Sequence, residues 1–308
     1  MTSIRLLGLN GRNPLAYFAA LGCLSAVTRM RPQAHARLSW SAGAAPTPVL
    51  DAKGVDPDDL VTALDEDRHA WEGVPVLAFR DFEDVKLSAE DQRDYLQASR
   101  VANDGGRSAG LVTSLIAEGT FAKTGDRRGK PSDLHFTAGN QKFLVIARTL
   151  QREATAADVR EAVLGPWRYD RRLPTFGWDF TDDRVYAYGF SNPAKTDKFT
   201  VPGADWLGLL GLSAYPVCGR GEQASPAGAS GSWKRGTFRW GLWAEPLNWD
   251  AACSLTQTGY PLADVASLRA RVFRVLGAHI RRSDQGGYGS FSPSSVLWDA
   301  RDEGGNGD

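Results

Sequence analysis

The stretch IRLLGLNGRNPLAYFAALGCLSAV, residues 4–27, decides how the fold begins. Its first part, 4–9, predicts a short apolar strand, and an Asn-Gly turn follows at 10–11. Asn13 is placed to cap a helix, and Pro14 fills the first helical position, where its missing N–H has no partner to lose. The residues from 15 to 27 are apolar nearly all round, and a helix without a polar face must be buried. We therefore expect a strand–turn–helix unit at the centre of the core.

Three other interpretations of this stretch are weaker. Arg5 and Arg12 flank an apolar run as in a secretory leader, but a strand stands where the basic leader should be and no small-residue cleavage site follows. The apolar run is shorter than the about 20 residues of a membrane span, so we expect no membrane partner. The helix start beside Gly8 and Gly11 could bind a phosphate, but the Lys and Ser/Thr of a phosphate-binding loop are missing.

Composition indicates a soluble globular protein in a reducing compartment. The 308 residues suffice for one large or two modest domains, with 42% hydrophobic and 23% charged residues. The three cysteines, Cys23, Cys218 and Cys253, are odd in number and widely spaced. This argues against a disulfide framework and a thiolate zinc site, so we expect a cytoplasmic protein with Cys23 as a small core residue.

Charge is balanced overall but unevenly distributed along the chain. There are 36 Lys and Arg residues against 36 Asp and Glu residues. Segment 51–94 holds 14 acids and 5 bases, whereas segment 120–172 holds 11 bases and 6 acids. Segment 269–282 holds five arginines and no acid. Basic zones suit a polyanion and the acidic zone suits solvent or a basic partner, although each cluster alone is also typical of an ordinary solvated face.

Caps, periodicity and breakers predict a mixture of helices and short strands. The expected helices after the first are 56–68, 88–100, 108–118, 140–152, 155–165, 206–212, 248–257 and 262–282. The expected strands after the first are 37–41, 74–80, 185–190 and 237–243, with exposed or flexible loops at 123–132 and 219–232. The fold class is α+β, with mixed helices, short and mainly antiparallel strands, and no repeats.

A change of character near Gly165 divides the chain into a helix-rich part, 1–165, and a strand- and aromatic-rich part, 166–298. The two parts form either two domains or one. The remaining residues, 299–308, are rich in Gly and charge, and we expect a disordered tail there.

Catalytic signals are sparse. The four histidines include no pair at metal-binding spacing, and the chain has no Gly-x-Ser-x-Gly elbow. Asp179, Asp182 and Asp183 could bind Mg²⁺ as in a metal-dependent hydrolase, but three such residues also suit a turn between strands, which we favour. We expect no cofactor, no metal and no catalytic residue.

Binding signals are stronger, above all in the expected helix 262–282. At about 100° per residue, Arg271, Arg274, Arg281 and Arg282 gather on one side of it, opposite an apolar face. Rows of guanidinium groups suit phosphates, and the aromatic residues of the next segment could stack on bases. An ordinary amphipathic helix remains the alternative.

Three further basic segments carry candidate nucleic-acid contacts. They are Arg127, Arg128 and Lys130; Arg171 and Arg172; and Lys234 and Arg235. The aromatic neighbours of the last two, Trp167, Tyr169 and Trp233, are more typical of core or sheet residues than of platforms for bases.

Several short blocks resemble proteins encoded with type I-G (formerly I-U) CRISPR systems. They are 7–22 (LGLNGRNPLAYFAALG), 182–187 (DDRVYA), 202–207 (PGADWL), 215–217 (YPV) and 238–243 (FRWGLW). The blocks are scattered over most of the chain, and each is mostly structural in character.

This resemblance implies a non-catalytic subunit of an RNA-guided interference complex that holds guide RNA or target DNA. The implied partners are RNA or DNA and other CRISPR effector subunits. Two alternatives remain within the same system: a protein-interaction scaffold that contacts other subunits through its acidic zone, and an accessory module of the nuclease-helicase.

Overall fold

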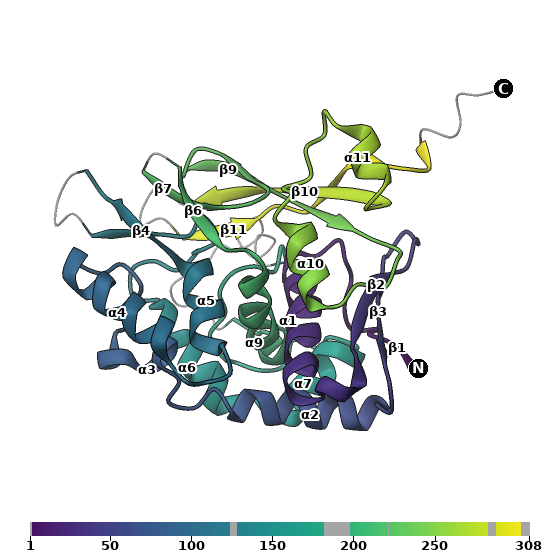
Figure 1. Cartoon of the computed structure of the whole chain (residues 1–308), viewed down its shortest axis with the longest axis horizontal. Coiled ribbons are helices and arrows are strands. Elements are labelled where there is room, and N and C mark those ends of the chain that lie inside the picture. Colours follow the sequence, from purple (N-terminus) through teal and green to yellow (C-terminus); the bar gives the residue numbers. More distant parts are fainter. Residues whose placement is uncertain (1, 124–127, 182–197, 221, 283–287, 303–308) are drawn as a thin grey trace.

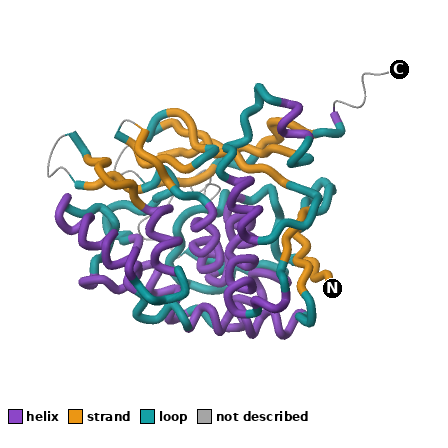
Figure 2. The backbone as a smooth tube through the Cα atoms, viewed as in Figure 1, coloured by secondary structure: helices purple, strands orange, loops and turns teal. Residues whose placement is uncertain are grey.

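The computed structural model describes residues 2–123, 128–181, 198–220, 222–282 and 288–302. Within them, most helices form one layer and most strands lie across it in a second layer (Figures 1 and 2). A small sheet near the N-terminus flanks the helical layer (Figure 1). The expected α+β class, with helices and short antiparallel strands, is confirmed.

Helix α1, Pro14–Met30, occupies the centre of the molecule as the sequence predicts. Every residue from Pro14 to Val27 is buried, and the Asn13 side chain accepts a hydrogen bond from the Leu15 N–H. Burial on all sides explains why this helix has no polar face. Among the described residues, no helix is both long and apolar enough to cross a membrane.

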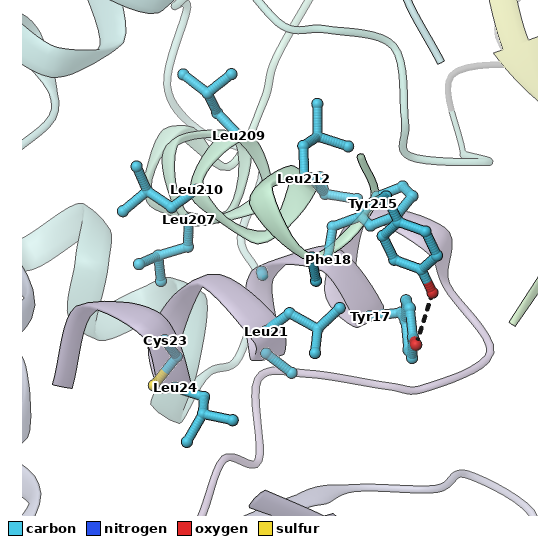
Figure 3. Close-up of a cluster of buried hydrophobic side chains, with 14 of the residues drawn as sticks. Tyr17, Phe18, Leu21, Cys23, Leu24, Leu207, Leu209, Leu210, Leu212 and Tyr215 are labelled. Carbon is cyan, nitrogen blue, oxygen red and sulfur yellow. Dashed lines mark hydrogen bonds between the residues drawn. The ribbon is translucent and has the colours of Figure 1, made fainter. Parts of the chain in front are cut away.

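Helix α9, Pro202–Gly211, packs directly on α1 because two glycines let the backbones touch (Figure 3). A Cβ atom on Gly22 would overlap the Leu207 carbonyl, and one on Gly211 would overlap the Phe18 carbonyl. Close approach therefore requires the absence of a side chain at both positions.

The other helices surround this pair and largely match the predicted ones. They are α2 Pro57–His69, α3 Pro75–Ala78, α4 Ala89–Val101, α5 Arg107–Leu115, α6 Phe143–Glu153, α7 Ala156–Leu164, α10 Trp249–Thr256 and α11 Val265–Arg269, with short 3-10 turns η1 Pro32–Ala34, η2 Phe79–Asp81 and η4 Leu212–Ala214. The first residues of four expected helices, Asp56, Ser88, Thr155 and Asn248, all accept hydrogen bonds from the first turns of those helices.

The strands form one five-stranded sheet, one three-stranded sheet and two hairpins in the described part of the chain. The large sheet contains β8 Ala229–Gly231, β9 Arg235–Leu242, β10 Arg274–Arg282, β11 Gly289–Phe291 and β12 Ser295–Asp299. The small sheet contains β1 Thr2–Arg5, β2 Arg37–Trp40 and β3 Pro48–Ala52, and the hairpins pair β4 Ile116–Phe121 with β5 Gly129–Pro131 and β6 Val217–Arg220 with β7 Gln223–Pro226.

The inner face of the large sheet packs on α1 and joins the two parts of the sequence. Phe238 and Trp240 of β9 are fully buried and contact the rings of Phe18 and Tyr17. The Tyr17 and Tyr215 hydroxyls lie 2.8 Å apart in a hydrogen bond (Figure 3). Residues from 1–165 and 166–298 thus share one hydrophobic core.

The predicted helix 262–282 is wrong. The described chain forms the short helix α11 and then strand β10, which pairs with β9 from Arg274 to Arg281. Leu276, Ala278 and Ile280 alternate inward against the core, a spacing of two residues that competes with the helical spacing. Arg271, Arg274, Arg281 and Arg282 therefore do not form one helical face.

Five smaller predictions also need correction. Segment 74–80 is not a strand but α3 and η2. Segment 219–232 is not a loop: its described residues contribute to β6, β7 and β8. The helix expected over 108–118 ends at Leu115 and continues as β4, and the basic loop 123–132 contains β5. The expected disordered tail, 299–308, begins with an ordered residue, because Asp299 ends β12 and is buried. Residues 303–308 of that tail and the predicted strand 185–190 lie outside the described residues.

Candidate nucleic-acid interface

Strands β9 and β10 place two arginines directly opposite each other. Arg235 begins β9 and pairs in register with Arg281 near the end of β10. Both side chains are exposed, whereas their strand neighbours Gly236 and Ile280 are buried. Alternation along a strand therefore directs both arginines to the outer face of the sheet. Like charges in directly opposed positions generally destabilise a sheet, and an anion bound across the pair would favour this arrangement.

The β8–β9 turn at this end of the sheet is fixed by Arg282. Its guanidinium group donates to the carbonyl oxygens of Trp233 (3.0 Å), His135 (2.8 Å) and Asp133 (2.7 Å). It also lies 3.5 Å from the centre of the Trp233 ring and 5.3 Å from that of Phe136. Burial lowers the pKa of Arg282 to about 10, against the opposing effect of Asp133, so the side chain stays charged at neutral pH.

Arg220 of β6 reaches the same turn, although its segment was expected to be a loop. Its guanidinium donates to the Gly231 carbonyl at 3.0 Å, and its side chain remains 47% exposed. The exposed residues Lys234, Arg235 and Arg281 lie around the same turn and strand end. We name these four residues, Arg220, Lys234, Arg235 and Arg281, the basic hairpin end.

A second group of cations continues from the basic hairpin end along the neighbouring hairpins. Lys123 and Lys130 both interact with Glu222, which lies just beyond β6. Arg128 is exposed beside β5 and accepts a hydrogen bond from Ala122 through its carbonyl. Glu222 neutralises part of the charge of this second group.

The acid Asp133 lies beside Arg220 of the basic hairpin end and is only 5% exposed. Its carboxylate accepts hydrogen bonds from Gln223 at 2.9 Å and Ser225 at 2.5 Å. The Arg220 guanidinium lies 4.0 Å from it, so that contact is weak.

The remaining arginines expected on one helix face lie apart. Arg274 is buried and its Nε donates to Asp299 at 2.7 Å, which makes it part of the core. Arg271 is exposed but precedes β10, at the opposite end of the strand from Arg281. At about 3.3 Å per residue, the distance along β10 from Arg274 to Arg281 is roughly 23 Å.

The other sequence candidates also separate from the basic hairpin end. Arg171 lies 3.1 Å from the Asp158 carboxylate, and Arg172 lies over the Phe199 ring at 4.9 Å. Both follow α7 in the helix-rich part of the fold. Arg127 lies outside the described residues. Of the candidates identified from the sequence, Lys234, Arg235 and Arg281 come together, with Arg128 and Lys130 on the adjacent hairpin.

His135 has a structural role next to the basic hairpin end and is not placed as a catalytic base. Its Nε2 lies 2.8 Å from the Asp84 carboxylate, and its ring stacks on Phe143. Burial lowers the pKa of His135, and this effect outweighs the opposing influence of Asp84. His135 is therefore neutral at pH 7, and its backbone carbonyl is one of the three acceptors of Arg282.

Asp179, a possible Mg²⁺ ligand from the sequence, accepts hydrogen bonds within the protein instead. Asp179 is buried and accepts hydrogen bonds from Asn13, Tyr169 and the Thr181 N–H, the last of which forms the expected turn. Asp182 and Asp183 lie outside the described residues. Among the residues that the structure describes, no group of three His, Cys, Asp or Glu side chains could hold a metal ion.

Two of the cysteines, Cys23 and Cys253, are not activated nucleophiles. Cys23 is fully buried in α1, and burial raises the pKa of its thiol to about 12. Burial, and to a smaller degree Asp250, raises the pKa of Cys253 to about 12 as well. Thiols with such pKa values remain protonated near neutral pH.

Sequence reasoning missed Arg220 and the role of Trp233. The segment around Arg220 is rich in Gly and Ser, which favours a loop prediction. The residue pattern Val217-Cys218 and Ala224-Ser225 around a Gly-containing turn was the available signal for a hairpin. When compared with protein-family models and with curated proteins, the chain matches none.

Proposed function

We propose that this protein is a non-catalytic subunit of a type I CRISPR interference complex, and that it holds guide RNA or target DNA at the basic hairpin end. The assignment to a CRISPR system rests on the sequence resemblance of 7–22 and the other blocks. The assignment of the binding surface rests on one observation, the direct opposition of Arg235 and Arg281 on the outer face of the sheet.

The chemistry of this surface suits a phosphate backbone. Guanidinium groups donate paired hydrogen bonds to phosphate oxygens, and two of them on adjacent strands lie within reach of one nucleotide. Lys234 adds a third cation in the turn, and Arg220 adds a fourth from β6. Backbone contacts of this kind give affinity without sequence readout, as a subunit that follows a guide or a target needs.

Salt dependence tests the proposal directly. Binding of a labelled guide RNA or single-stranded DNA is measured at several salt concentrations, alone and in the assembled complex. If four cations neutralise four phosphates, the logarithm of the association constant falls with a slope of about −3 against the logarithm of salt concentration. Arg235→Ala with Arg281→Ala is expected to reduce that slope by about 1.4.

A charge-matched control separates position from net charge. Arg5 and Arg271 are exposed arginines away from the basic hairpin end, so Arg5→Glu with Arg271→Glu changes the net charge as much as Arg235→Glu with Arg281→Glu. The first pair is expected to leave binding close to wild type, and the second to abolish it. Equal loss with both pairs, or salt-independent binding, would contradict the proposal. Co-purification with other subunits but without nucleic acid would favour the scaffold alternative.

A further inference from the structure

Trp233 stands apart from the other tryptophans. All ten lie in the described part of the chain. Six are buried in the core, and Trp167, Trp249 and Trp298 are partly buried and pack against it. Trp233 belongs to neither group and retains part of its exposure. The part of Trp233 that stays exposed lies in the β8–β9 turn, where an aromatic ring can contact a ligand.

Arg282 holds the Trp233 ring in a fixed orientation. The guanidinium group lies 3.5 Å from the ring centre, which places it against one face of the ring. Its Nε also donates to the Trp233 carbonyl, so side chain and backbone of the same residue are held by one group. Arg282 is itself fixed by the carbonyls of His135 and Asp133. The ring is thus ordered before any ligand binds.

We propose that Trp233 is a stacking platform for an unpaired base, so that the basic hairpin end takes single-stranded rather than duplex nucleic acid. This inference rests on the proposed function. Lys234 and Arg235 follow Trp233 directly in the turn, and Arg281 lies opposite Arg235. A base on the ring would leave its phosphates beside these cations, the combination by which proteins hold single strands.

Strand selectivity follows from the position of the ring. In a duplex each base stacks on its neighbours, so an aromatic side chain at the tip of a turn cannot reach a base face without opening the helix. In a single strand, the base faces are available. The preordered ring also loses little conformational freedom on binding, which favours affinity.

The test separates stacking from backbone contact by using three probes. They are an oligothymidylate of about 20 nucleotides, an abasic strand of the same length, and a duplex of the same length. The variants are Trp233→Leu, which still covers Arg282 but cannot stack, and Trp233→Phe, which keeps a ring. Circular dichroism and thermal unfolding check that each variant folds.

We expect Trp233→Leu to weaken oligothymidylate binding by about 10-fold and to leave abasic-strand binding unchanged, with Trp233→Phe close to wild type. Wild-type protein should bind the oligothymidylate more tightly than the duplex. Equal oligothymidylate binding by wild type and Trp233→Leu, while Arg235→Ala with Arg281→Ala still weakens it, would overturn the stacking inference and leave the proposed function standing. Absence of salt-sensitive binding to any probe would overturn both.

Discussion

The two ends of β10 both carry arginines, but the two environments differ in kind. At the start of the strand, Arg274 and Asp299 are each about 4% exposed in their side chains and bind each other. At the other end, Arg281 is exposed opposite Arg235, and Arg282 is held by carbonyl oxygens. The first end has its counterion inside the protein. The second end places Arg235 and Arg281 side by side on the outer face of the sheet, an arrangement that suits an anion.

The largest effect should come from removing the counterion at the buried end. Asp299→Asn leaves the Arg274 charge buried without its carboxylate, while the Gly43 carbonyl still accepts a hydrogen bond from it at 3.0 Å. We expect a loss of about 3 kcal/mol in the free energy of unfolding, because breaking a buried ion pair leaves one charge uncompensated. Urea unfolding at neutral pH measures this loss. Asp302→Asn, at an exposed neighbouring acid, serves as the control and should change stability little.

The stability difference between wild type and Asp299→Asn should also depend on pH. Hydrogen bonds from Arg301 hold the pKa of Asp299 well below its usual range, although burial acts in the opposite direction. Hydrogen bonding and charge attraction from Arg274 lower this pKa further. A carboxylate with a lowered pKa in the folded state stabilises the protein above its unfolded pKa of about 3.9, and loses that contribution as pH falls. The stability difference between wild type and Asp299→Asn should therefore narrow from about pH 5 downward. A difference that is constant over this range would contradict the role given to the Asp299 charge.

The contrast between the ends of β10 also explains what the sequence could and could not predict. Local signals specified α1, because Asn13, Pro14 and an apolar run act within one helix. The segment 262–282 contains both a helical spacing and an alternating spacing of apolar residues. Its pairing with β9, which lies more than 30 positions earlier, decides between them. Such long-range pairing leaves no signal within the segment itself.

The candidate site shows the same limit. Lys234, Arg235 and Arg281 could each be identified as exposed cations from their neighbours in sequence. Their gathering could not be predicted, because it depends on the register that aligns Arg235 with Arg281. Arg274 looked equivalent to Arg281 in sequence, yet its partner Asp299 lies in a segment that was expected to be a disordered tail.

A smaller effect on stability is expected at the exposed end. Arg282→Met removes the donor from the carbonyls of Trp233, His135 and Asp133, and we expect a loss of about 2 kcal/mol in the free energy of unfolding. Arg282→Lys keeps the charge but lacks the planar fork, so it should recover only part of the loss. Chemical unfolding measures both variants. If Arg282→Met were as stable as wild type, the β8–β9 turn would be fixed by other contacts.

Single substitution of Arg281 should affect binding rather than folding. Arg281→Ala removes one of two opposed positive charges, so we expect stability within about 0.5 kcal/mol of wild type. Binding of single-stranded nucleic acid should weaken by roughly 5-fold at low salt, and by less at high salt. Thermal unfolding and a binding titration on the same preparation separate the two effects. A variant that unfolds more readily and binds normally would place Arg281 among the structural residues with Arg274.

The smallest effect is expected at Arg271, and it tests the structure against the sequence pattern most directly. A helix over 262–282 would place Arg271 on the same face as Arg281, so Arg271→Ala and Arg281→Ala would weaken binding equally. The strand instead places Arg271 before β10, at the far end from the basic hairpin end. Arg271→Ala should therefore change neither the free energy of unfolding by more than about 0.5 kcal/mol nor the affinity for single strands by more than about 2-fold. Because both residues are exposed arginines in one segment, a difference between the two variants reports their different distances from the basic hairpin end.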